Sequence, residues 1–226
     1  MKSLAAMIGT LFLLVATPAI SATTSWVEGK NYFLITRPQK WIETPGKVEV
    51  TEVFSYGCPA CFQFVPTMQK LKKSLPANVA LDYLPASFHP EEGWVVFQRA
   101  YLTASIMGVA DKAHDAIYDA IWKTNELAVI DPTTRRPKKL LPTIEDVANF
   151  YHRQTGVDAA QFVATAKSFS VDSKMRAADA MIGGYQVDRT PTIVVNGKYL
   201  CHVESAGGPD QLIELVNWLV AKESHK

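Results

Sequence analysis

The chain has 226 residues, of which 48% are apolar and 20% are charged, and its formal net charge is +1. This length and composition indicate a folded protein with a sizeable core and exclude a disordered chain. A net charge so close to zero gives no reason to expect a nucleic-acid partner.

The first 22 residues have the pattern of a secretory signal peptide. Lys2 supplies a short charged region, an apolar stretch follows over 4–16, and Pro18 ends it. Small side chains then occur within 19–22, so we expect cleavage between residues 19 and 22. The pattern predicts an exported protein in a compartment where disulfides persist.

The first part of the mature chain predicts a unit of alternating strands and helix. We expect strands over 31–35, 48–54 and 78–88, where β-branched and aromatic residues are concentrated. A helix should run from Cys58 to about residue 74, because its apolar side chains recur every three or four positions. Pro66 lies inside that helix and should kink or restart it.

One side chain of the strand over 48–54 differs from its neighbours. Val48, Val50, Glu52 and Phe54 share a face, because strand side chains alternate between the two sides of a sheet. Glu52 is therefore a candidate buried acid.

From residue 91 onward the apolar pattern changes to the helical period. Thr143 and Asp158 are expected N-caps of two of these helices. A later helix over 170–182 should stop at Gly183-Gly184, because glycine commonly ends helices.

The end of the chain predicts a hairpin and a final helix. The segments "PTIVV" and "YLCHV" read as strands joined by an Asn-Gly turn, and a helix should cover about 209–221. The order of elements predicts an α/β fold that is interrupted by a helical insertion.

The chain contains three cysteines, Cys58, Cys61 and Cys201. The first two could be a redox pair, half of a zinc site or a structural staple. So few cysteines in a chain of this size argue against a staple. Cys201 and His202 are adjacent on a predicted strand and should point to opposite faces, which argues against four converging zinc ligands.

Other candidate groups fit no ligand pattern. We expect Cys201 to be a buried filler, with pairing between chains or regulation of the site as alternatives. The histidines with no ligand spacing, expected at the surface or as caps, are His89, His114, His152 and His225. The basic run over 135–139 is expected to be a solvated loop.

A strand that leads into Cys-X-X-Cys at a helix start, with Pro66 five residues after the second cysteine, is typical of the thioredoxin fold. Together with the segment "EGKNY", the helical insertion and the stretch "VDRTPTIVVNGKY", this pattern resembles DsbA-type periplasmic thiol:disulfide interchange proteins. The resemblance implies a thioredoxin-like α/β fold in two parts, over 23–90 and 170–226, with a helical domain inserted over 91–169.

The resemblance also implies the site. Cys58 and Cys61 would be the catalytic pair, and Pro191 would be a cis-proline that faces them, preceded by Thr190. Glu52 falls where the family keeps a buried acid.

Pro59 and Ala60 separate the two cysteines, whereas the family commonly has Pro-His there. Alanine offers no polar group to a thiolate, so the helix start and the backbone must supply more of the stabilisation.

By the same resemblance, the protein would donate its disulfide to reduced or unfolded exported proteins in the periplasm. A quinone-linked membrane oxidase of the DsbB type would reoxidise it. We expect no cofactor, no metal and a monomer. The alternatives are a periplasmic disulfide reductase, an isomerase-like protein of the same fold, and a non-catalytic binding module with a structural disulfide.

Overall fold

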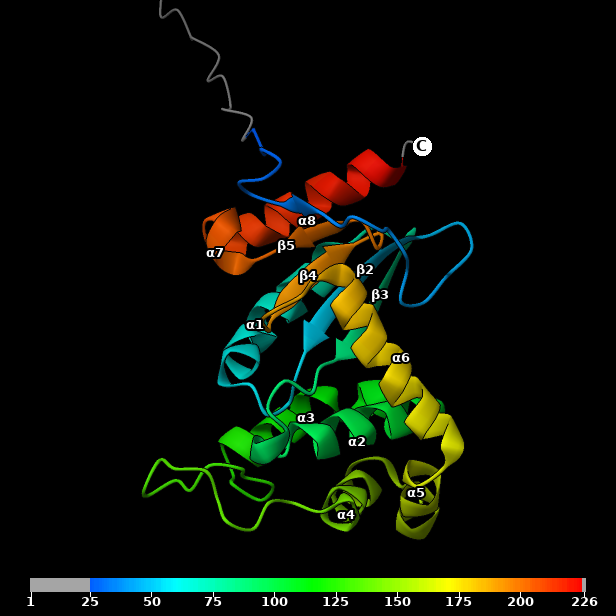
Figure 1. Ribbon diagram of the computed structural model, residues 1–226, viewed down its shortest axis with the longest axis vertical. Coiled ribbons are helices and arrows are strands. Elements are labelled where there is room, and N and C mark those ends of the chain that lie inside the picture. Colours follow the sequence, from blue (N-terminus) through cyan, green and yellow to red (C-terminus); the bar gives the residue numbers. More distant parts are fainter. Residues whose placement is uncertain (1–24, 225–226) are drawn as a thin grey trace, which may run out of the picture.

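The computed structural model describes residues 25–224 (Figure 1). The expected signal peptide and its cleavage site lie outside the described residues. Within the described range, none of the helices combines the length and the apolar character that crossing a bilayer requires.

The centre of the fold is a five-stranded sheet with the strand order β1-β5-β4-β2-β3. The strands are β1 (Phe33–Leu34), β2 (Val48–Phe54), β3 (Val79–Pro85), β4 (Thr192–Val195) and β5 (Tyr199–Cys201). β2 and β3 run parallel, and the other neighbouring pairs are antiparallel. A parallel pair needs a crossover connection, which here contains helix α1 (Pro59–Ser74).

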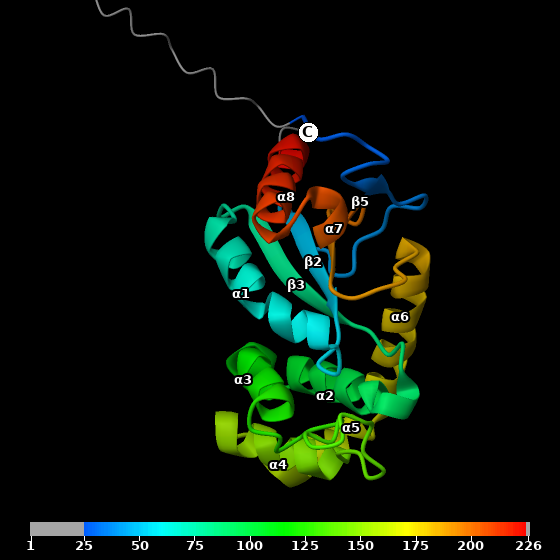
Figure 2. The same cartoon turned by 90° about the vertical axis from the view of Figure 1, so that its left-hand side faces the viewer.

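Helices cover both faces of this sheet, as Figure 2 shows. On one face, α1 and α8 (Pro209–Ser224) pack in a core cluster that includes Val50 of β2. On the other face, α6 (Phe169–Tyr185) packs in a cluster that includes Val53. The alternation of side chains along β2 therefore divides its apolar residues between two cores.

The segment between β3 and β4 is helical and ends in α6. Its other elements are the 3-10 turn η1 (Pro90–Glu92), α2 (Trp94–Ile106), α3 (Ala110–Trp122), α4 (Ile144–Thr155) and α5 (Ala159–Ala166). Thr143 and Asp158 accept hydrogen bonds from the backbone N–H groups of Asp146 and Gln161, so both predicted N-caps are confirmed. The helices share one core cluster with Cys58 and Cys61, which places the cysteines where sheet and helical block meet.

Helix α6 corrects one expectation. It continues through Gly183 and Gly184 to Tyr185 and ends at Gln186, which has a φ of +58°. Tyr185 is buried, and its hydroxyl donates to the Gln39 carbonyl at 2.8 Å. The burial of this last turn outweighs the roughly 1 kcal/mol that each glycine costs inside a helix.

The strands β1 and β5 are also shorter than the sequence predicts. The first strand is limited to Phe33–Leu34, the two residues that pair with β5. β5 stops at Cys201, because His202 is the N-cap of the short helix α7 (Val203–Ala206), which buries Ala206. The Asn-Gly hairpin turn is confirmed, with φ values of +51° at Asn196 and +62° at Gly197.

Pro66 does not restart α1, which is one helix from Pro59 to Ser74. The domain boundaries implied by the resemblance stay predictions.

Candidate active site

Cys58 is the N-cap of α1. Its backbone is extended, with φ −87° and ψ 117°, and its sulfur accepts a hydrogen bond from the Cys61 backbone N–H at 3.4 Å. Pro59 follows at the first helical position, where the missing N–H costs nothing and the fixed φ suits a helix. The sequence thus places a sulfur atom at the positive end of a helix, where a negative charge is stabilised.

The two thiols have unlike acidities. The pKa of Cys58 is lowered from 9.0 to about 6, chiefly because the Cys61 thiol donates a hydrogen bond to it. The Thr190 side chain and the N–H groups of Cys61 and Ala60 lower this pKa further, against the opposing effect of burial.

Burial has the opposite outcome at the second cysteine. Cys61 is 1% exposed, and its burial, together with the hydrogen bond to Cys58, raises its pKa well above the usual value. At neutral pH Cys58 is therefore mainly a thiolate, and Cys61 keeps its proton.

A segment more than 130 residues further along the chain faces Cys58. The peptide bond between Thr190 and Pro191 is cis, as the resemblance implied. In its protonated form the Cys58 thiol donates to the Thr190 carbonyl at 3.5 Å. The sheet register explains the approach, because Val53 of β2 pairs with Thr192 of β4 at the end of β2 that leads into Cys58.

Glu52 is buried in β2, with 3% of its surface exposed. Its pKa is raised well above the usual value, first by burial and then by the negative charges of Cys58 and Asp115. The same carboxyl raises the pKa of Cys61.

Glu52 also lines a hollow of about 300 Å³ between α1 and α3. The other charged side chains that line this hollow are Lys72, Asp111, Lys112 and Asp115. The buried carboxyl therefore adjoins a polar space that charged groups border.

An aromatic cluster with one histidine supports the loop before Cys58. The Tyr56 hydroxyl and His114 Nδ1 form a hydrogen bond of 2.9 Å, and the rings of Phe54 and Tyr118 lie 5.0 Å from the Tyr56 ring. Burial lowers the pKa of His114 to about 4, so this ring is neutral at physiological pH.

The expectation that His114 is a surface or capping residue is wrong, because the side chain is 7% exposed. A signal was present in the sequence: His114 precedes the buried residues Ile117 and Ile121 by three and seven positions, which is the helical period.

Two tryptophans hold the same loop and were not singled out by sequence. Trp122 Nε1 donates to the Tyr56 carbonyl at 2.9 Å. A Cβ atom at position 57 would lie 2.7 Å from the Trp94 ring, so only glycine fits there. Neither contact has a local sequence pattern, because the partners are 66 and 37 residues apart in the chain.

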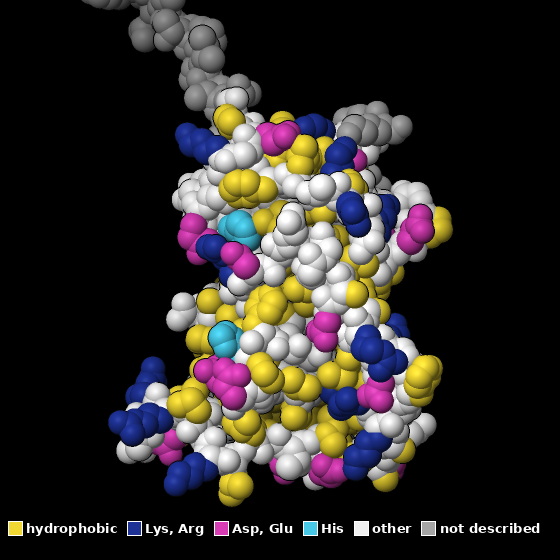
Figure 3. All heavy atoms as spheres, viewed as in Figure 1, with side chains coloured by type: hydrophobic (Ala, Val, Ile, Leu, Met, Phe, Trp, Pro, Cys, Tyr) yellow, Lys and Arg dark blue, Asp and Glu magenta, His cyan; other side chains and the backbone are white. Residues whose placement is uncertain are grey.

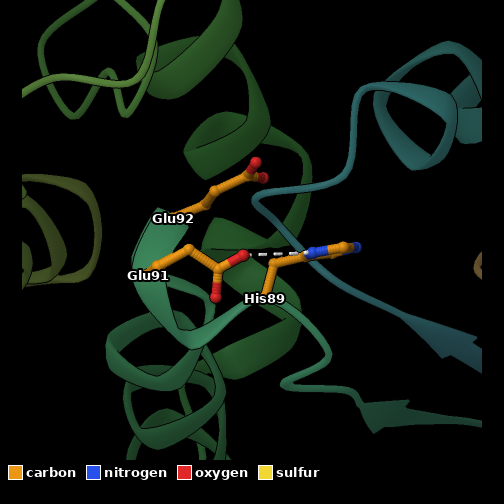
Figure 4. Close-up of side chains that lie close together, drawn as sticks. All are labelled: His89, Glu91 and Glu92. Carbon is orange, nitrogen blue, oxygen red and sulfur yellow. Dashed lines mark ion pairs between the residues drawn. The ribbon is translucent and has the colours of Figure 1, made fainter.

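Cys201 lies away from this site. It is fully buried in the cluster beneath α8, and burial raises its pKa. Among residues 25–224, one group of three side chains could hold a metal ion, and it consists of His89, Glu91 and Glu92 (Figure 4). His89 and Glu91 form an exposed ion pair of 3.5 Å. The described cysteines are not part of this group.

Comparison with known proteins gives the family. A family model described as "Thioredoxin" matches residues 43–216. The thiol:disulfide interchange protein DsbA of Pseudomonas aeruginosa is 37% identical over 198 residues, which cover 88% of this chain and 86% of that protein. The chain belongs to the DsbA family. The DsbA of Azotobacter vinelandii is 33% identical over 215 residues, which are 95% of this chain and 93% of that protein.

Solved structures agree with this assignment. The crystal structure of P. aeruginosa DsbA matches with a TM-score of 0.73 at 37% identity, over 88% of this chain and 95% of that one. The oxidoreductase DsbA from Xylella fastidiosa matches with a TM-score of 0.76 at 29% identity, over 88% of this chain and 98% of that one. The thioredoxin-like α/β fold is thereby confirmed, and the chain is a thiol-disulfide oxidoreductase of oxidative protein folding.

Proposed function

We propose that the oxidised protein donates a Cys58–Cys61 disulfide to reduced exported proteins in the periplasm, after removal of the signal peptide. The observation that carries the assignment to these residues is the unequal acidity of the two thiols. The protein would act as a monomer, without cofactor or metal.

The reaction takes two thiol-disulfide exchanges. A substrate thiolate attacks the Cys58 sulfur, the Cys58–Cys61 bond breaks, and Cys61 leaves as a thiolate that takes up a proton. A second substrate thiolate then attacks the substrate sulfur of this mixed disulfide, and Cys58 leaves as a thiolate. The substrate loses two electrons and the Cys58–Cys61 pair gains them.

Glu52 is proposed to supply the proton that Cys61 needs. Its raised pKa favours the protonated carboxyl, which can donate a proton, and the carboxylate that remains raises the pKa of Cys61. Thr190 and Pro191 would bind the extended substrate through backbone contacts next to the disulfide. Pro59 and Ala60 would shape the helix start, with the Ala60 N–H contributing to the low pKa of Cys58.

The reduced protein would be reoxidised by a quinone-linked membrane oxidase of the DsbB type. The same low pKa favours the oxidising direction, because stabilising the reduced thiolate makes the disulfide a better electron acceptor. A reduction potential near −120 mV would agree with a disulfide donor, and one near −270 mV with a reductase.

The experiment is oxidation of a reduced, unfolded protein substrate by the mature protein, followed by thiol titration. Cys58→Ser and Cys61→Ser should each abolish turnover. The matched control is Cys201→Ala, which should keep the rate because Cys201 is buried away from the site. Retained turnover in Cys58→Ser would contradict the assignment.

The Glu52 proposal has its own test. Glu52→Gln keeps the shape of the side chain but cannot donate an acidic proton, so the first exchange should slow about 100-fold near pH 7. The measurement is the pH profile of the mixed-disulfide formation rate. A merely structural Glu52 predicts an unchanged profile.

A further inference from the structure

A hollow of about 630 Å³ lies beside Cys58, on the side of the helical block. Gly57 and Pro59, the chain neighbours of Cys58, line one edge, and Phe62 of α1 lies next to them. Thr190 and Pro191 are not among the described residues that line it. The volume is within the range of pockets that bind small molecules, and we call this hollow the Pro59 pocket.

Part of the wall of the Pro59 pocket is apolar and held in place by ring contacts and a hydrogen bond. The Phe62 and Trp122 rings are stacked, with an interplanar angle of 17° and centroids 6.3 Å apart. The hydrogen bond from Trp122 Nε1 to the Tyr56 carbonyl holds that ring. The half-buried Ile130 completes the apolar lining from the segment after α3. An apolar group could therefore enter a preformed site, which lowers the cost of binding.

The side chains that border the Pro59 pocket include one acidic residue, Glu92, but the neighbouring loop over 135–139 is basic. Arg135 lines the pocket, and the basic residues Arg136, Lys138 and Lys139 follow in the same exposed loop. Figure 3 shows Lys and Arg side chains gathered over the segment between α3 and α4, which projects from the helical block in Figure 1.

This loop has a defined shape. The Asp131 carboxylate accepts from the Thr133 and Thr134 N–H groups, and the Lys138 N–H donates to the Val129 carbonyl at 2.8 Å. None of the ion pairs among residues 25–224 involves Arg135, so its charge is available to a ligand.

We propose that the Pro59 pocket binds a large apolar side chain of the polypeptide whose cysteine reacts at Cys58, and that Arg135 favours an acidic residue beside it. This inference rests on the proposed function, which brings a reduced polypeptide to Cys58. Gly57 and Pro59 place the pocket next to Cys58, and the basic loop that begins at Arg135 complements an acidic substrate segment.

The dimensions set the spacing in the substrate. A hollow of this volume is roughly 10 Å across, and an extended chain advances about 3.3 Å per residue. The apolar residue should therefore lie two to four positions from the reacting cysteine.

The test uses short peptides with one cysteine. In a first set of four peptides, Phe or Ala stands three positions before the cysteine, and Glu or Lys stands next to that Phe or Ala. In a second set, the same residues stand after the cysteine at the same spacing. The rate of reaction with the oxidised protein is measured for each. In one set we expect Phe to react about tenfold faster than Ala. Glu should react two- to fivefold faster than Lys at low salt, with less difference at high salt.

Two variants connect the preferences to the pocket. Gln63→Trp, at an exposed position of α1, should fill the pocket and bring the Phe/Ala rate ratio close to one. Arg135→Glu should reverse the Glu/Lys preference. The matched controls, Lys73→Trp on α1 and Arg37→Glu, change exposed residues outside the pocket and should keep the wild-type ratios. Ratios between peptides cancel any change in the reactivity of Cys58 itself.

The outcomes separate this inference from the function on which it rests. Equal rates for all peptides, or a Phe/Ala ratio that survives Gln63→Trp, would overturn the Pro59 pocket while disulfide donation stands. Failure of the oxidised protein to react with any peptide, or with the reduced unfolded protein, would instead overturn the proposed function.

Discussion

Reduction of the Cys58–Cys61 pair should make the stability of this protein depend on pH through the Cys58 thiol. That thiol titrates only in the reduced form, because the oxidised form holds the sulfur in a disulfide. Its pKa is about 6 in the folded protein and 9.0 without the fold, with the hydrogen bond from Cys61 as the largest cause. Cys58 is 6% exposed, so solvent screening of these interactions is small.

The sign follows from the lowered pKa. Stabilisation by the Cys58 thiolate is fully present above pH 9 and is lost as the pH falls through 6. These two pKa values give a stabilisation of the reduced form of about 1.4 kcal/mol at pH 7 and about 0.1 kcal/mol at pH 5. The value at pH 7 raises the reduction potential by about 30 mV.

The assay is urea denaturation of the oxidised and the reduced protein at pH 5 and pH 7. The free energy of unfolding of the reduced form, relative to the oxidised form, should rise by about 1.3 kcal/mol between these pH values. Glu52 makes the stability fall as the pH rises, because its pKa is raised in the folded protein, but this effect is present in both the oxidised and the reduced form. Repeating the measurement in Glu52→Gln removes this contribution. The control Cys58→Ser should show no thiol-dependent rise. A relative stability that stays constant or falls from pH 5 to pH 7 would refute the reasoning.

Three further outcomes follow from the packing. Cys201→Ser should lower the free energy of unfolding by about 1–3 kcal/mol, because it buries a hydroxyl in an apolar cluster. Urea denaturation of this variant and of Cys201→Ala separates the effect of the hydroxyl from the loss of the sulfur atom. Gln186→Gly should raise the free energy of unfolding by about 0.5–1 kcal/mol, because glycine adopts the φ of +58° at this position without strain. A lower melting temperature than that of the wild-type protein would contradict this expectation. Trp122→Phe keeps an aromatic ring but removes the hydrogen bond to the Tyr56 carbonyl. It should therefore lower the free energy of unfolding by about 0.5–1.5 kcal/mol in thermal denaturation, and no loss would argue against that bond.

Much of the fold could be predicted from local patterns. The alternation in "VEVTEVF" gave β2 with its observed bounds, and the Asn-Gly dipeptide gave the hairpin between β4 and β5. Element ends were less predictable. Gly183 and Gly184 are typical of a helix end, yet the buried Tyr185 extends α6 past them, and this burial depends on contacts with a distant part of the chain.

The site divides in the same way. The sequence by itself determined that Cys58 stands at a helix start, that Pro59 allows that helix to begin, and that Glu52 is on a buried strand face, because each depends on neighbours a few residues away. The helix start by itself favours Cys58 as the more acidic thiol. The tertiary structure added the burial that raises the pKa of Cys61 and brought the Thr190 segment to Cys58 through the register of β2 and β4.

The tertiary structure alone also placed His114 against Tyr56 and assembled the Pro59 pocket from α1, α3 and the basic loop. A cavity is a property of surfaces that chain folding brings together, and no local pattern encodes its volume. The physical reason is one of range: backbone preferences and periodicity act over a few residues, whereas desolvation and packing depend on the whole fold.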